Sequence, residues 1–98
     1  MTSSPEGRLT VGRFKVVFSD KAGKDTDALS DNDFNRIVNG CKRLEDNPFP
    51  DGKHIKKLKG YEDLYRLRIG DYRIVFEWRG SQINIARILT RQDFGKKY

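Results

Sequence analysis

The chain has 98 residues, enough for one domain with a single modest core. Its residues are 36% hydrophobic, 35% charged and 11% aromatic, a composition typical of a small globular protein and not of a disordered one. No apolar run approaches the roughly 20 residues that cross a bilayer, so we expect no membrane partner. The opening residues lack the apolar stretch of a secretory signal, and Cys41 has no second cysteine. We therefore expect a cytoplasmic protein.

The positive charge lies entirely in the second half of the chain. Residues 1–50 carry eight Lys or Arg and eight Asp or Glu, whereas residues 51–98 carry twelve against six, which accounts for the net charge of +6. Such asymmetry indicates an anionic partner, most often a nucleic acid. A basic surface that only interacts with water is the alternative, and charge alone does not separate the two.

The first elements follow from composition and periodicity. Residues 1–12 are small and polar without periodicity, so we expect a flexible tail followed by a single domain at 13–98. Alternating apolar side chains predict a strand at 14–18. Ser19 is placed to cap a short helix that ends near Leu29.

A second helix has a stronger signal. Ser30 and Asp33 resemble a capping box, with Asp in the place of the usual Glu. Asn47-Pro48 ends the helix, because a proline disfavours helical geometry at the residue before it. The helix has one apolar face, made of Phe34, Ile37, Val38, Cys41 and Leu44. We expect Cys41 to be a small core residue.

A basic loop follows at 47–60. His54 has no Cys, His or paired carboxylate at a metal-binding spacing, so we predict neither a metal site nor a cofactor. Four lysines of the loop either contact phosphates or only keep the loop soluble: Lys53, Lys56, Lys57 and Lys59.

Three further strands are predicted at 63–69, 72–78 and 83–89, with turns at 70–71 and around 79–82. The order of elements is β-α-α-β-β-β. This order predicts an α+β domain in which two N-terminal helices pack on a mainly antiparallel four-stranded sheet.

The turn at residues 70–71 fixes which side chains face each other. A two-residue loop there pairs Ile69 with Tyr72 and therefore places Arg68 directly opposite Arg73, with Arg66 on the same face. At about 5 Å the repulsion between two such charges is roughly 1–3 kcal/mol. Folding alone gives no reason to keep this arrangement.

Two interpretations of the facing arginines remain. Guanidinium groups donate paired hydrogen bonds to phosphate oxygens, so an RNA phosphodiester would turn the repulsion into a binding site. Alternatively, the arginines extend into water or pair with Glu77 and Asp71. We favour recognition of a phosphate.

The same segment resembles a known family. LKGYEDLYRLRIGDYRIVFEW, preceded by NPFPDGKHIKKLKG and followed by INIARIL and TRQDFGKKY, is similar to the RelE side of the RelE/ParE toxin superfamily. With RFKVVFSDKAGKD as first strand and helix, the resemblance covers residues 13–98. It implies a RelE-like fold and a toxin of a type II toxin–antitoxin system, held inactive by a RelB-like antitoxin. It also implies an endoribonuclease, an mRNA interferase that cuts messenger RNA in the ribosomal A site without a metal.

The resemblance also implies roles for individual residues. Arg66 and Arg68 stand where relatives keep basic residues that orient the substrate and stabilise the transition state. Arg73 matches the arginine that holds the scissile phosphate, which the neighbouring ribose 2′-hydroxyl attacks. Arg91 matches a general acid or charge stabiliser, and Tyr98 matches a tyrosine that stacks on a base and serves as general base.

Three points of this assignment stay open. Arginine cannot act as a base at neutral pH, so proton abstraction falls to Tyr98, whose pKa near 10 neighbouring cations would have to lower. Phe94 could occupy the aromatic position instead. Strict alternation from Ile83 would point Arg91 toward the core, so the last strand must end or bulge before Arg91.

Two other functions compete with the nuclease. One is a ParE-like toxin that inhibits DNA gyrase and cuts nothing; the other is a catalytically inactive, basic nucleic-acid-binding relative. The combination of four arginines and a C-terminal aromatic residue favours the ribosome-dependent nuclease.

Overall fold

The computed structural model describes residues 13–98, and the tail expected for residues 1–12 lies outside the described residues. The elements run in the order β1 (Lys15–Phe18), α1 (Asp20–Asp27), α2 (Asp31–Lys42), the 3₁₀ turn η2 (Arg43–Glu45), β2 (Ile55–Lys57), β3 (Leu64–Ile69), β4 (Tyr72–Arg79), β5 (Gln82–Thr90) and α3 (Arg91–Lys97). The predicted α+β class is confirmed. Two elements were not predicted: the short strand β2, which makes the sheet five-stranded instead of four-stranded, and the C-terminal helix α3.

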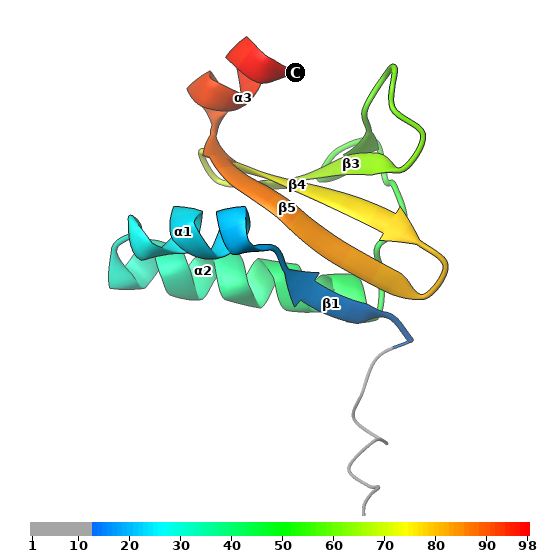
Figure 1. Cartoon of the computed structure of the whole chain (residues 1–98), viewed down its shortest axis with the longest axis horizontal. Helices are drawn as coiled ribbons and strands as arrows, with labels where there is room; N and C mark the ends of the chain where they lie inside the picture. The colour runs from blue at the N-terminus through cyan, green and yellow to red at the C-terminus, as the bar shows by residue number, and fades with distance from the viewer. Residues whose placement is uncertain (1–12) are drawn as a thin grey trace, which may run out of the picture.

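The sheet separates two unequal layers of helix. Its strand order is β1-β5-β4-β3-β2, with β1 parallel to β5 and every other pair antiparallel. Helices α1 and α2 cover one face, and α3 lies on the opposite side, which we call the outer face (Figure 1). Within residues 13–98 no helix has the length and apolar character needed to cross a membrane.

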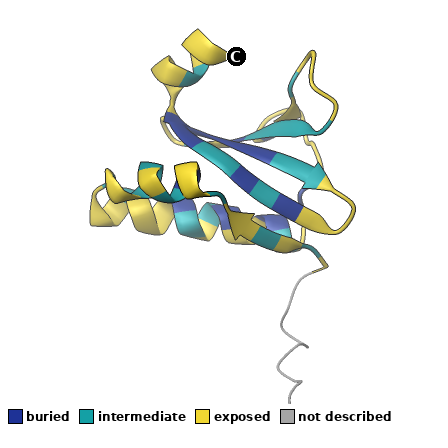
Figure 2. Ribbon diagram, viewed as in Figure 1, coloured by how far each residue is buried: buried dark blue, intermediate teal, exposed yellow. Residues whose placement is uncertain are grey.

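The core lies between the sheet and the helices α1 and α2 (Figure 2). Cys41 is only 1% exposed, which confirms it as a core residue. Phe34 was expected on the buried face of α2 but is 41% exposed, because it faces an open groove between α1 and α2. The buried cluster consists of Ala22, Ile37, Cys41, Leu44, Ile55, Leu67, Ile74, Phe76, Ile83, Ile85 and Ile88.

Two tight hairpins set the register of the central strands. In the first, Ile69 pairs with Tyr72 and Arg68 with Arg73, as the two-residue loop predicts. Gly70 has φ +55° and Gly80 has φ +58°, and each is the first central residue of its loop. A positive φ at this position alone is the geometry of type II′ turns, which match the twist of the flanking strands.

A β-bulge in β5 sets the direction of its second half. Phe76 pairs with Ile85, whereas the next residue along, Val75, pairs with Arg87, so Ala86 is an extra residue in β5. The bulge shifts the alternation and puts Arg87 on the outer face with Val75. Arg91 can join the other arginines only if β5 ends or bulges before it. Both occur, because the bulge lies at Ala86 and β5 ends at Thr90.

Ser19 ties the first helix to this bulge. Its hydroxyl accepts the Ala22 amide as the N-cap of α1 and donates to the carbonyl of Ala86 at 2.9 Å. The hydroxyl of Ser30 caps α2 by accepting from the Asp33 amide, and no second bond of this hydroxyl occurs among residues 13–98.

We predict that Ser19→Ala lowers the free energy of unfolding by about 1–3 kcal/mol, because it removes a cap and a partly buried hydrogen bond. Ser30→Ala, which removes a cap alone, is the matched control with an expected loss of about 1 kcal/mol. Urea unfolding followed by circular dichroism measures both values. Equal losses would show that the bond to the bulge contributes nothing.

Candidate active site

Four arginines gather on the outer face of the sheet, and we call Arg66, Arg68, Arg73 and Arg91 the arginine cluster. Arg68 lies directly across from Arg73, and Arg66 across from Val75. These residues therefore share one face, which α1 and α2 leave uncovered. The register worked out from the sequence is confirmed at each of these pairs.

Arg73 is the centre of the cluster. It is only 8% exposed, and its Nη1 donates to the carbonyls of Gly70 at 2.9 Å and Tyr72 at 3.0 Å. Burial lowers the pKa of Arg73, and the nearby charges of Arg68, Arg66 and Arg91 lower it further, whereas the charge of Asp71 raises it. Arg73 nevertheless stays protonated at any physiological pH.

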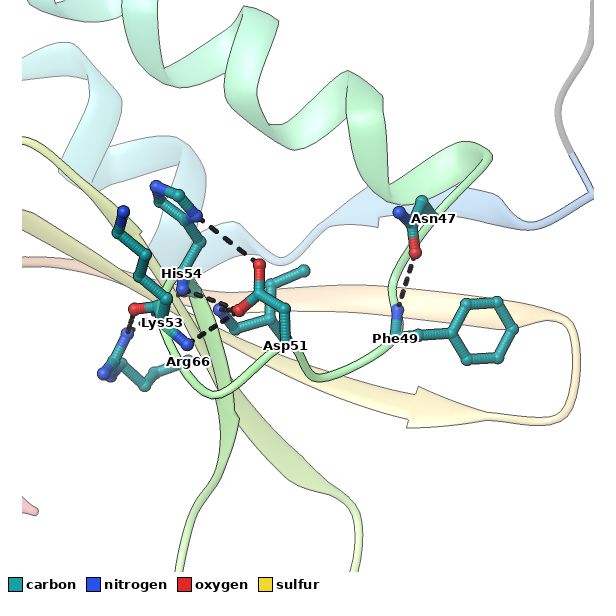
Figure 3. A network of polar contacts seen from close by, with 7 residues as sticks. Asn47, Phe49, Asp51, Lys53, His54 and Arg66 are labelled. Carbon is teal, nitrogen blue, oxygen red and sulfur yellow. Dashed lines mark hydrogen bonds and ion pairs between the residues drawn. The ribbon is translucent and has the colours of Figure 1, made fainter.

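A tight turn positions Arg66 (Figure 3). Its Nη1 donates to the carbonyl of His54 at 3.1 Å and to that of Lys53 at 3.5 Å. These carbonyls belong to a loop that Asp51 closes, since Asp51 Oδ1 accepts the amides of Lys53, His54 and Ile55 at 2.7–3.0 Å. The three amides hold the pKa of the Asp51 carboxyl far below its usual value of 3.8. Sequence reasoning missed Asp51, although Pro50-Asp51-Gly52 is a recognisable turn signal.

Arg91 opens the C-terminal helix. Its amide donates to the carbonyl of Asp71 at 2.7 Å, which joins the end of β5 to the β3–β4 turn. From this point α3 rises on the outer face at the end of β5, with Phe94 half-buried and its other residues exposed (Figure 1). Val75 and Leu89 are 0% and 7% exposed there although they lie outside the main core. The outer face around the arginines therefore contains two well-buried apolar side chains.

Three aromatic rings form a group on the outer side of the sheet, and we call Tyr61, Phe94 and Tyr98 the aromatic wall. Tyr98 stacks on Phe94 with ring centroids 5.3 Å apart, and it meets Tyr61 at 5.8 Å with an interplanar angle of 61°. Phe94 is half-buried, whereas Tyr98 is 39% exposed. Both candidates for the aromatic position thus occur together, with Tyr98 the more accessible ring.

The predicted lysines divide into two groups. Lys56 pairs with Arg66 across β2 and β3, so it extends the basic face. Lys57 pairs with Tyr65 and lies on the helix side of the sheet, away from the cluster. Lys53 and Lys59 are exposed in loops on either side of β2. Only Lys56 is in register with the arginines.

His54, the only histidine of the sequence, contacts one carboxylate and is not part of a group of metal ligands among the described residues. Its Nδ1 lies 3.4 Å from Asp51 Oδ2, an ion pair only when the imidazole is protonated. Within residues 13–98 no three His, Cys, Asp or Glu side chains gather as metal ligands. His54 therefore belongs to the turn that positions Arg66.

Other arginines of the sheet are neutralised by acids. Arg79 pairs with Asp63 at 3.1 Å and with Glu77 at 3.3 Å. Arg87 donates to both carboxylate oxygens of Asp25, at 2.9 and 3.2 Å. By contrast, none of the ion pairs found among residues 13–98 includes a member of the arginine cluster. Of the two acids considered for that role, Glu77 pairs with Arg79, and Asp71 raises the pKa of Arg73 without forming an ion pair with it among the described residues.

The Asp25–Arg87 pair also covers the edge of β5, because Asp25 accepts the backbone amide of Ile88 at 2.9 Å. Burial opposes ionisation of Asp25, but hydrogen bonds from Arg87 and from the Ile88 amide hold the Asp25 pKa below 3.8. The bond to Asp25 likewise raises the pKa of Arg87. This charge is therefore structural, unlike those of the cluster.

Comparison with known proteins gives the family. The family model described as "ParE toxin of type II toxin-antitoxin system, parDE" matches residues 16–93. Toxin RelE3 of Methanocaldococcus jannaschii is 50% identical over 38 residues, which cover 39% of this chain and 43% of that protein. RelE1 of the same organism is 32% identical over 83 residues, covering 82% of this chain and 92% of the relative.

A solved structure agrees with the sequence relatives. A chain of the RelB–RelE antitoxin–toxin complex from Methanococcus jannaschii is 30% identical, with a TM-score of 0.69, covering 84% of this chain and 98% of that chain. This chain therefore belongs to the RelE/ParE family of type II toxin–antitoxin toxins, and its fold is RelE-like. The resemblance over residues 13–98 predicted this family, and the comparisons confirm it.

We predict that Arg68→Ala leaves the free energy of unfolding unchanged or raises it by up to about 1 kcal/mol, because it removes the repulsion facing Arg73. Arg87→Ala is the matched control on the same face, with an expected loss of about 1–3 kcal/mol because it removes two charge-assisted bonds. Thermal and urea unfolding measure both. A large loss for Arg68→Ala would make Arg68 a structural residue.

We further predict that Asp51→Ala destabilises the fold in a pH-dependent way. Because the folded pKa of Asp51 is depressed, its contribution is fully present above the unfolded value of about 3.8 and is lost as pH falls toward the folded value. Unfolding measured between pH 7 and pH 2 should therefore show the gap between parent and variant closing only below about pH 4. Glu62→Ala, in the neighbouring exposed loop, is the control; a gap independent of pH contradicts the role given to Asp51.

Proposed function

We propose that this toxin is a ribosome-dependent endoribonuclease that cleaves messenger RNA in the ribosomal A site and so inhibits translation. The observation that carries the proposal is the arginine cluster, in which Arg73 is almost buried, faces Arg68 and has no acidic partner among residues 13–98. A site that holds converging positive charges without a counter-ion is suited to a ligand that brings its own negative charge. A phosphodiester of single-stranded RNA is such a ligand.

The proposed reaction is an internal transesterification. The 2′-oxygen of the ribose attacks the adjacent phosphorus and loses its proton to a base, while the bond from phosphorus to the 5′-oxygen breaks and that oxygen takes up a proton. The products are a 2′,3′-cyclic phosphate and a 5′-hydroxyl. Arg73, with Arg66 and Arg68, stabilises the negative charge that grows on the pentacoordinate phosphorane, usually the largest catalytic contribution.

The remaining residues orient the substrate and move protons. Arg91, whose charge lowers the pKa of Arg73, acts on the leaving oxygen as charge stabiliser or acid. Tyr98 stacks on a base and is the candidate general base, since arginine cannot accept a proton at neutral pH. Lys56 extends the basic face toward the flanking phosphates. The chemistry proposed here needs no metal, because the guanidinium groups supply the positive charge.

The proposed partners are a RelB-like antitoxin, the ribosome and messenger RNA. The fold match to a RelB–RelE complex supports the antitoxin as partner. An antitoxin that covers the outer face would block the cluster directly. We also propose that the protein acts in the cytoplasm, where the ribosomes are.

The alternative is a ParE-like toxin that blocks DNA gyrase without cutting nucleic acid. The description of the matching family model favours it. The arginine cluster favours the nuclease, because inhibition of gyrase by protein contact gives no reason to keep facing arginines without acids. A catalytically inactive, basic nucleic-acid-binding relative would keep the charges without the cleavage.

We predict that purified protein added to in vitro translation cuts a defined message at codon-phased positions, mapped by primer extension. Arg73→Ala should lower the cleavage rate by about 10²–10³-fold, the loss typical of removing one transition-state donor. Arg79→Ala, on the same strand but paired with acids, is the control and should cut like the parent. Intact message together with blocked supercoiling by gyrase would transfer the assignment to the ParE-like function.

A further inference from the structure

Tyr61 is a large exposed ring in a position that the predicted catalytic set does not include. It lies in the loop between β2 and β3 and is 44% exposed. This loop rises from the sheet on the same side as α3 (Figure 1). Its ring meets that of Tyr98 at 5.8 Å and 61°, although 37 positions of sequence separate the two residues. The two tyrosines thus form an open corner of two aromatic surfaces.

This corner lies on the same side of the sheet as the arginine cluster. Helix α3 begins at Arg91 and spans seven residues to Lys97, so Tyr98 lies about 10 Å from Arg91 along the helix. Tyr61 precedes the start of β3 by three positions, and Arg66 is the third residue of that strand. The rings and the guanidinium groups therefore lie on the same side of the sheet, with Tyr98 at the far end of α3 from Arg91.

A nucleotide presents the same two kinds of group. Its phosphate takes charged donors and its base takes a flat aromatic surface, and this combination is how proteins bind single-stranded RNA. We propose that Tyr61 is a base-stacking residue: the base of the nucleotide next to the scissile phosphate lies in the corner between Tyr61 and Tyr98. This inference rests on the proposed nuclease function and adds a residue from a second element to its substrate site.

A purely mechanical role for Tyr61 makes different predictions. An edge-to-face pair contributes about 0.5–1.5 kcal/mol, so Tyr61 could serve only to hold α3 against the loop. In that case, removing the Tyr61 ring would lower the free energy of unfolding and would slow the cleavage of all codons equally. A stacking role instead depends on the π-face of the ring and on the size of the base, because a purine covers more of the ring than a pyrimidine does.

The test is cleavage of a message series that varies the base at the cut site, with stability measured in parallel. We expect Tyr61→Ala and Tyr61→Leu to lower kcat/KM by about 5–150-fold, more for purines than for pyrimidines, and Tyr61→Phe to restore cleavage to within about threefold of the parent. Phe49→Ala is the control, because Phe49 is 49% exposed and makes a similar T-shaped contact with Trp78 at 5.3 Å, remote from the cluster.

The outcomes separate the two proposals. If the parent protein cuts and Tyr61→Ala cuts the same codons at the same rate, the stacking role is overturned and the nuclease stands. Losses that follow thermal stability, are equal for every base and are reversed by Tyr61→Leu also overturn it. If the parent cuts no message, the nuclease proposal fails and the role of Tyr61 fails with it.

Discussion

The outer face of the sheet is organised around the opposition of Arg68 and Arg73, two like charges that the β3–β4 register places directly across from each other. Arg73 is nearly buried, and within residues 13–98 its guanidinium group donates only to the backbone carbonyls of Gly70 and Tyr72. Neighbouring arginines reinforce the positive field, since each of Arg66, Arg68 and Arg91 lowers the pKa of Arg73. The fold tolerates this repulsion because the hairpin turn and the apolar face of the sheet fix the register independently of it.

The rest of the molecule holds that arrangement in place. Asp51 closes the turn whose carbonyls receive Arg66, and the bulge at Ala86 redirects the second half of β5 so that Arg91 reaches the same face. Where a charge has only a structural role, an acid accompanies it, as Asp25 accompanies Arg87. The difference between paired and unpaired arginines on one sheet is the clearest physical sign of a binding site.

Local signals predicted much of this from the sequence. The Gly70-Asp71 loop and the alternation of apolar residues gave the register, and with it three members of the cluster. The strand β2 was missed because Ile55-Lys56-Lys57 is too short to show alternation, and α3 was missed because RQDFGKK contains Gly95 and has no apolar face. The contacts Asp25–Arg87 and Tyr61–Tyr98 join residues far apart in the chain, so no local pattern could predict them. From the sequence, a bulge in β5 was only one of two ways, with an earlier end of the strand, by which Arg91 could join the other arginines.

The proposed function requires that an RNA phosphodiester be the counter-ion of the arginine cluster. The most direct measurement is a structure of the protein on a ribosome whose message carries a 2′-O-methyl group at the cut site, which blocks attack and traps the substrate. We expect the scissile phosphate within hydrogen-bond distance of Arg73, with Arg66 and Arg68 around it. A message phosphate bound elsewhere on the protein, or no occupancy of the A site, would contradict it.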